Sequence, residues 1–110
     1  MRLDFFLPRT PDSTALRNWA LGVLVKQYGG ATWITGNGQW QADNTVLREQ
    51  VDWITCFTDG LKDVERLWIE RSFLPRLAEQ YRLESAPQTC FLFVINNDPV
   101  YWEETHGAQP

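Results

Sequence analysis

Arg48 and Glu49, together with Gln39 and Trp40 shortly before them, are the side chains in this sequence best suited to binding chemistry. The Arg48 guanidinium could hold a small anion or a carboxylate, with Trp40 as an aromatic lid. Neighbouring residues of a strand point to opposite faces, so Arg48 and Glu49 cannot form one catalytic pair. The competing interpretation is cross-strand ion pairing that protects a sheet edge from aggregation. The four residues are therefore candidates for binding a ligand or a partner, and no catalytic residue is predicted.

The remaining side chains with reactive chemistry do not form a recognisable site. The single histidine, His106, follows Glu103 and Glu104 in a tail that contains glycine and proline. This Glu-Glu-x-His spacing matches no known pattern of metal ligands, so no metal site is predicted. Cys56 and Cys90 lie in apolar segments, where burial disfavours the thiolate. They are expected to be reduced, buried residues and not nucleophiles.

The segment GGATWITGNGQW, residues 29–40, raises the question of a phosphate-binding loop. A dinucleotide fingerprint needs a third glycine, but Gln41 stands at its position and no helical period follows. A P-loop needs Gly-Lys-Ser/Thr, which this segment lacks. Asn37-Gly38 is instead a strong signal for a hairpin turn, because both residues tolerate positive φ. The segment predicts a turn between two strands, and no cofactor is predicted.

The charge balance argues against partners that require clustered basic residues. Ten Lys and Arg against fourteen Asp and Glu residues give a net charge of −4. Binding to nucleic acid or to a membrane is therefore not expected. No apolar run approaches the length of a membrane helix, and the apolar patch near the start is too short for a signal peptide, which predicts a cytoplasmic protein. A chain of 110 residues is expected to form one domain.

Hydrophobic periodicity divides the chain into strands and helices. Segment 2–7 alternates with a period of two, which is typical of a strand, whereas segment 14–28 has the spacing of an amphipathic helix. Pro75 predicts a kink or break near 72–74 in a second helical region. The expected elements are strands at 2–7, 31–35, 45–57 and 89–95, a turn at 36–38, a bend at 42–44, and helices at 14–28 and from 58–60 to about residue 82. The buried face of the strand at 45–57 is expected to carry Leu47, Val51, Trp53 and Phe57.

This order of elements predicts an α+β protein with the ferredoxin-like β-α-β-β-α-β arrangement. Such a fold has one four-stranded antiparallel sheet with two helices on one face, and right-handed crossovers place the first and third strands in the centre. The predicted domain covers residues 1–97, and residues 98–110 form a C-terminal tail.

The last predicted strand is apolar on both faces, which is unusual for a sheet with one face open to water. Phe91, Phe93 and Ile95 would face the helices, which leaves the alternate residues of the strand and Phe6 on the other face. An apolar patch of this kind usually marks an interface. We therefore expect a homo-oligomer, with a dimer favoured, whose sheet face is covered by another subunit or by the tail. The predicted interface residues are Phe6, Cys90, Leu92, Val94 and Trp102.

Several short motifs resemble an uncharacterised bacterial family, domain of unknown function 3574. They are an early strand at 5–7, a tryptophan in the first helix, Gly38-Gln39-Trp40, and Arg48-Glu49 before an apolar strand. The similarity extends over roughly residues 3 to 94. Because the family carries no established activity, the resemblance supports the predicted fold and implies no function.

The leading functional hypothesis is a noncatalytic cytoplasmic domain for binding or assembly, which uses its sheet face and the hairpin around Trp40. The alternative is a small cofactor-independent enzyme of the dimeric α+β barrel kind, which would hold an apolar small molecule between sheet and helices. Such enzymes need a poised acid or base inside the pocket. An enclosed cavity with a charged residue would favour the enzyme, whereas a filled core and an occupied sheet face would favour assembly.

Overall fold

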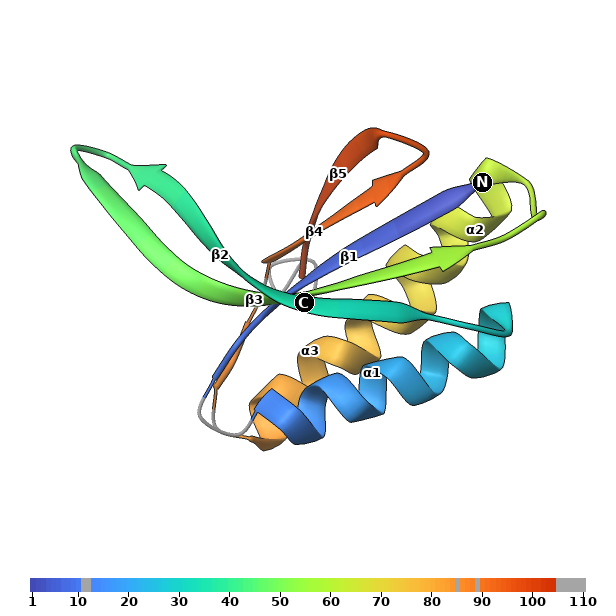
Figure 1. The fold of residues 1–110 in the computed structure, drawn as a ribbon, viewed down its shortest axis with the longest axis horizontal. Coiled ribbons are helices and arrows are strands. Elements are labelled where there is room, and N and C mark those ends of the chain that lie inside the picture. Colours follow the sequence, from blue (N-terminus) through green and yellow to red (C-terminus); the bar gives the residue numbers. More distant parts are fainter. Residues whose placement is uncertain (11–12, 85, 89, 105–110) are drawn as a thin grey trace, which may run out of the picture.

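The computed structural model describes residues 1–10, 13–84, 86–88 and 90–104 of an α+β protein. Figure 1 shows the helices on one face of a single sheet, with α1 and α3 side by side. The elements in chain order are β1 (Arg2–Pro8), α1 (Ser13–Tyr28), β2 (Thr32–Ala42), β3 (Thr45–Phe57), α2 (Lys62–Trp68), the π-helix η1 (Ile69–Phe73), α3 (Leu74–Leu83), β4 (Cys90–Ile95) and β5 (Asp98–Glu103). None of the helices in the described ranges is long and apolar enough to span a membrane.

The prediction of a four-stranded, ferredoxin-like sheet is wrong, because the sheet has five antiparallel strands in the order β2-β3-β1-β4-β5. Asn96 and Asn97 have φ values of 51° and 73°, so they form a tight turn of the kind that joins hairpin strands. The chain therefore folds back, and the first residues of the predicted tail pair with β4 as β5. Pro99 within this segment is tolerated because β5 is an edge strand.

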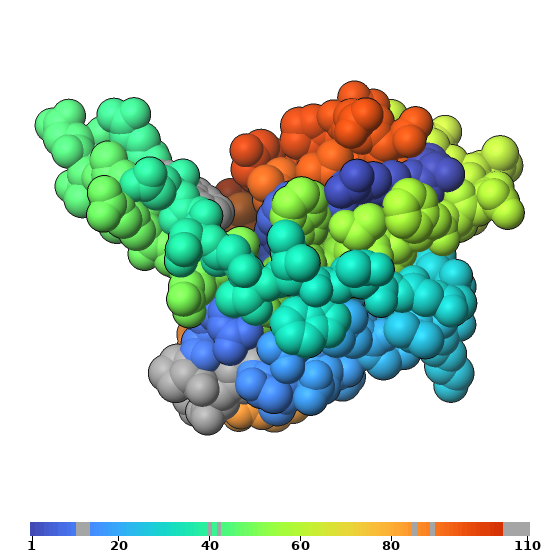
Figure 2. Space-filling view, viewed as in Figure 1, coloured from blue at the N-terminus to red at the C-terminus, as the bar shows by residue number. Residues whose placement is uncertain are grey.

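The turn predicted at Asn37-Gly38 is also wrong. Strand β2 runs through both residues, and the chain reverses at Asp43-Asn44, where Asp43 has a φ of 55°. All eleven residues of β2 pair with β3, so the pairing extends well past the helices. We call residues 36–50 the arm. Figures 1 and 2 show the arm standing clear of the body and bending away from the side that carries the helices.

The hydrophobic core lies between the sheet and the helices. Leu3, Phe5 and Leu7 of β1 point into it, as the alternation predicted. In β3 the predicted buried face is the wrong one, because Ile54 and Cys56 are buried while Phe57 is 66% exposed. The register explains the error, since Ile54 pairs with Phe5 and so shares its face.

The interruption predicted beside Pro75 takes the form of a π-helical turn. The N–H of Leu74 donates to the carbonyl of Ile69, five residues earlier, and α3 then begins with Pro75 in its first turn. Proline lacks the N–H that a regular helix would donate at this position, and the interruption of the regular helix by the π-helical turn accommodates it. The wider turn places the Ile69 and Phe73 side chains in the core.

Candidate functional site

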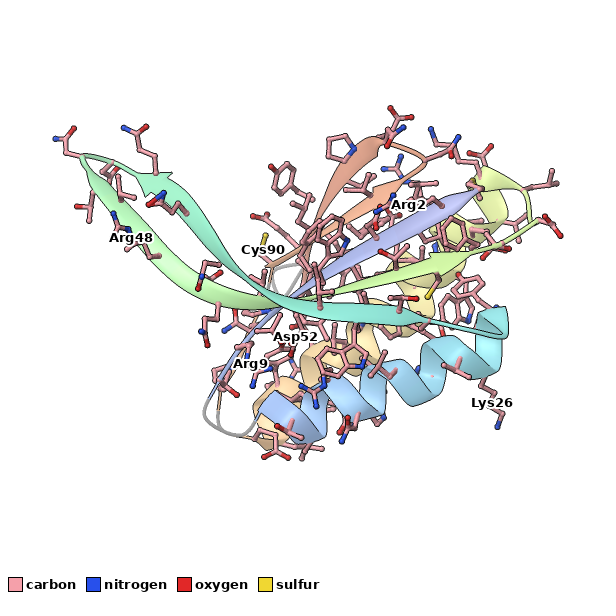
Figure 3. The ribbon with its side chains drawn as sticks, in the orientation of Figure 1. Arg2, Arg9, Lys26, Arg48, Asp52 and Cys90 are labelled. Atoms are coloured by element: carbon pink, nitrogen blue, oxygen red, sulfur yellow. The ribbon has the colours of Figure 1, made fainter. Side chains whose placement is uncertain are left out.

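The four predicted binding residues lie on the arm, but they do not form one site. Arg48 pairs with Gln39 across the two strands, and its Nε donates to Gln39 Oε1 at 2.9 Å on an exposed surface. Glu49 pairs with Gly38 and points to the opposite face. Trp40 pairs with Leu47 through the backbone, and its side chain lies outside the described part of the structure. Figure 3 shows Arg48 well away from the body.

The predicted interface residues divide between the two faces of the sheet. Phe6 pairs with Leu92 in the sheet, and Cys90 and Val94 share their side, which is the side without helices. We call it the helix-free face. Trp102 is on the other side, where its ring lies 5.9 Å from that of Phe91 and its Nε1 donates to the carbonyl of Glu70 at 3.1 Å.

Three further apolar residues, Trp53, Ile34 and Tyr101, complete the helix-free face, although the sequence pattern does not predict them there. Trp53 stacks on Phe6 with 5.5 Å between ring centroids, and the Arg2 guanidinium lies 5.8 Å from the centre of the indole. Ile34 pairs with Trp53 and is 53% exposed, and Tyr101 pairs with Leu92 and is 71% exposed. One row of paired residues on this face is therefore apolar across all five strands.

Beneath this apolar surface lies a buried carboxylate. Asp4 is 6% exposed and accepts hydrogen bonds from Trp53 Nε1 at 2.9 Å and from Thr55 Oγ1 at 2.7 Å. Arg2 Nε donates to both of its oxygens at 3.1 Å. These contacts satisfy the buried charge, and they fix the edge of the Trp53 indole against the sheet.

A concave pocket of about 290 Å³ lies on the helix-free face where the arm leaves the body. It brings Glu49 of the arm together with three predicted interface residues, Phe6, Cys90 and Leu92. Cys90 is exposed, unlike the prediction, and both cysteines are free thiols. Burial, followed by the charge of Glu103, raises the pKa of the Cys90 thiol. The full lining is Phe6, Pro8, Glu49, Val51, Gln88, Cys90, Phe91, Leu92 and Tyr101.

A second buried carboxylate lies on the helix side, at the base of the arm. Asp52 is 1% exposed and accepts hydrogen bonds from Arg9 Nη1 at 2.9 and 3.1 Å and from Thr35 Oγ1 at 2.9 Å (Figure 3). The Arg9 backbone N–H donates to the Gln50 carbonyl at 2.9 Å. The cluster joins β1, β2 and β3 at one point. Both carboxylate oxygens of Asp52 accept hydrogen bonds within the cluster, so we assign it a structural role.

Within the described residues there is no group of three or more His, Cys, Asp or Glu side chains that could hold a metal ion. His106 lies outside the described residues. Comparison of the chain with protein-family models, with curated proteins and with solved structures finds no match. The resemblance to domain of unknown function 3574 therefore stays a prediction.

Proposed function

We propose that the chain is a noncatalytic assembly domain that forms a homodimer through its helix-free face. The observation that carries this proposal is the exposure of apolar side chains there, led by Ile34 and Tyr101 beside the Phe6–Trp53 stack. A sheet face that meets only water is normally polar at these positions. Contiguous apolar patches on protein surfaces commonly mark interfaces, since covering them removes apolar area from water.

The arm supports a second copy of the chain as the occupant. An isolated two-stranded hairpin is marginally stable in water, yet the arm has exposed Val46 and Leu47 and stands clear of the body. In a dimer with two-fold symmetry the same patch is used by both subunits. Each arm could then lie across the helix-free face of the partner, so that one contact covers both exposed surfaces.

The enzyme alternative has less support from the structure. The space between sheet and helices is filled by core side chains such as Phe5, Phe73 and Phe93. The carboxylate at its margin, Asp52, is engaged by Arg9 and Thr35. Tyr81 at the same end donates its hydroxyl to the Pro8 carbonyl at 2.7 Å, and burial raises the pKa of that hydroxyl. Asp52 and Tyr81 therefore hold the fold together, and neither is free to act as the acid or base of a pocket.

The test compares two substitutions of exposed apolar residues. Ile34→Glu places a charge on the helix-free face, and Val64→Glu places the same charge on α2 at a site of similar exposure. In sedimentation velocity at tens of micromolar, we expect the native chain and Val64→Glu to be dimers and Ile34→Glu to be a monomer. Circular dichroism should be alike in all three. A monomeric native chain, or a dimer that Ile34→Glu leaves intact, would contradict the proposal.

A further inference from the structure

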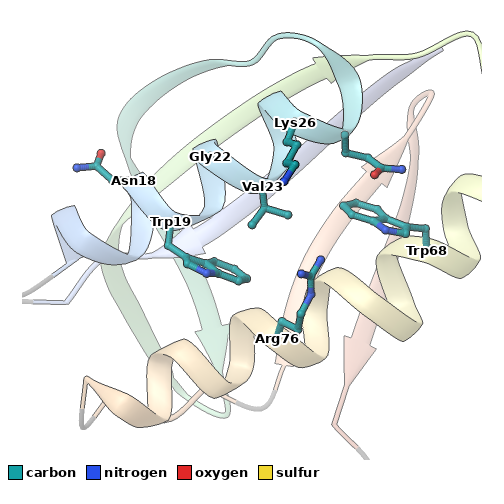
Figure 4. A pocket seen from close by; sticks show the side chains of 8 residues that line it. Asn18, Trp19, Gly22, Val23, Lys26, Trp68 and Arg76 are labelled. Carbon is teal, nitrogen blue, oxygen red and sulfur yellow. The ribbon is translucent and has the colours of Figure 1, made fainter.

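The helix layer contains a groove of about 760 Å³ that is separate from the helix-free face. It lies between α1 and the segment from Trp68 to Arg76, and it opens away from the sheet, since the sheet-facing positions of α1 are Leu16, Ala20 and Leu24. Figure 4 shows Trp19 and Trp68 on either side of this space, with Val23 between them. Its volume is in the range of small-molecule sites.

The two tryptophans are held in place by a buried ring. Phe73 stacks on Trp19 with 6.1 Å between centroids and a 7° interplanar angle, and on Trp68 with 5.7 Å and 12°. Tyr28 meets Trp68 edge-on at 5.6 Å. Phe73 belongs to the π-helical turn, and such turns are frequent at functional sites. The half-buried indoles thus offer preorganised aromatic surfaces to the groove.

A glycine keeps the groove open. Gly22 lies in the middle of α1, where glycine lowers helix stability relative to alanine. A Cβ at this position would meet no atom within 4 Å, so close packing does not require glycine here. Because Gly22 has no side chain, the space between α1 and the segment from Trp68 to Arg76 stays open.

The groove also carries uncompensated positive charge. Lys26 on α1 and Arg76 on α3 both line it; Figure 4 shows Arg76 directed between the helices, and Figure 3 shows that Lys26 extends outward from α1 at the rim. In the described part of the chain neither forms an ion pair, and Arg76 Nε donates only to the Ser72 carbonyl of the preceding π-helix η1 at 3.2 Å. Among the described residues no Asp or Glu lines the groove, although the whole chain has a net charge of −4. Two cations above aromatic walls complement an anion with an apolar body.

We propose that this groove binds a small aryl carboxylate. The ring of the ligand contacts the indoles of Trp19 and Trp68, and the carboxylate accepts hydrogen bonds from Arg76 and Lys26. A planar ring suits the flat indole surfaces, and the guanidinium suits the two oxygens of a carboxylate. The site is on the opposite side of the molecule from the helix-free face, so this proposal does not depend on dimerisation.

The test uses 2-naphthoate as the probe and 2-naphthylmethanol as its uncharged counterpart. In ¹H–¹⁵N spectra each of the six tryptophans contributes one indole signal. We expect 2-naphthoate to shift the signals of Trp19 and Trp68 saturably, and the alcohol to bind roughly tenfold more weakly. Shifts confined to Trp33 and Trp53, equal affinity for the alcohol, or no saturable shift up to about 10 mM would overturn the proposal.

Variants separate this site from other surfaces of the protein. Arg76→Gln and Lys26→Gln should each weaken 2-naphthoate binding several-fold, whereas Arg71→Gln, which removes an exposed cation of η1 outside the groove, should not. Gly22→Leu should fill the groove and abolish the shifts without loss of helical circular dichroism. Unchanged binding by Gly22→Leu, or an equal effect of Arg71→Gln, would contradict the assignment.

Discussion

Asp4 is a carboxylate placed beneath an apolar surface, where an unpaired charge is strongly unfavourable. Its partners Trp53 and Thr55 lie 49 and 51 residues further along the chain. Alternation along β1 predicts only that Asp4 faces away from the core. Its burial depends on which residues of β3 lie opposite Asp4 in the sheet. The sequence around Asp4 does not determine this pairing. The same holds for Asp52, which meets Arg9 from 43 residues away.

The Asp4 cluster leads to a prediction about stability. Asp4→Ala leaves the indole N–H of Trp53 and the hydroxyl of Thr55 without their acceptor, so we expect a loss of about 3 kcal/mol in the free energy of unfolding. Asp4→Asn retains one acceptor oxygen and should cost less. Urea denaturation followed by circular dichroism measures both. Asp98→Ala, which removes an exposed ion pair with Lys62, is the control and should change little. Equal effects of Asp4→Ala and Asp98→Ala would show that the cluster is unimportant.

At the scale of elements, sequence patterns identify most strands and helices but not how they pair. The strands around 2–7, 45–57 and 89–95 and the helix over 14–28 are close to those observed. The errors arise where the local sequence fits two conformations equally well. Asn37-Gly38 and Asp43-Asn44 both permit positive φ, and only the continuous ladder between β2 and β3 selects the second.

The errors about the site have the same origin. Strand β3 has apolar residues on both faces, so periodicity alone could not decide whether Trp53 or Ile54 is buried. The pattern therefore predicts Trp53 in the core, although Trp53 lies on the helix-free face beside Phe6. Pro99 and the preceding asparagines are typical of the end of a strand, so the pattern predicts Tyr101 and Trp102 in a tail, whereas the structure places them in the hairpin strand β5. The face predicted for Phe6, Cys90, Leu92 and Val94 is the one that the strand pairing shows.

Helix α1 provides a stability prediction at this scale. Gly22→Ala should raise the free energy of unfolding by about 0.5–1 kcal/mol, because alanine loses less backbone entropy in a helix and its Cβ meets no atom within 4 Å. Gly29→Ala is the matched comparison at the end of the same helix. Gly29 has a φ of 86°, which alanine tolerates poorly, so this change should destabilise the protein. Thermal denaturation in parallel distinguishes them, and a destabilising Gly22→Ala would mean that the groove is tighter than described.

At the scale of the whole molecule, the two faces have different characters. The helix layer is open at one groove lined by aromatic residues and cations, whereas the helix-free face is broad and apolar with a concave pocket beside the arm. An assembly that covers the helix-free face would leave the groove accessible in both subunits. Self-association and ligand binding are therefore compatible in one particle.

Removing the arm tests whether the body is complete without it. The variant lacks residues 38–49 and joins Asn37 to Gln50, which are paired in the native hairpin, through a two-residue Asn-Gly turn. Because the core and the Asp52 cluster lie outside the deleted segment, we expect a folded protein with nearly native circular dichroism.

The armless chain should be monomeric by native mass spectrometry at concentrations where the native chain is dimeric. Arg48→Ala, which removes only the exposed hydrogen bond to Gln39, should remain a dimer. An armless chain that dimerises as tightly as the native one would show that the arm lies outside the interface, and an unfolded one would show that the body needs it.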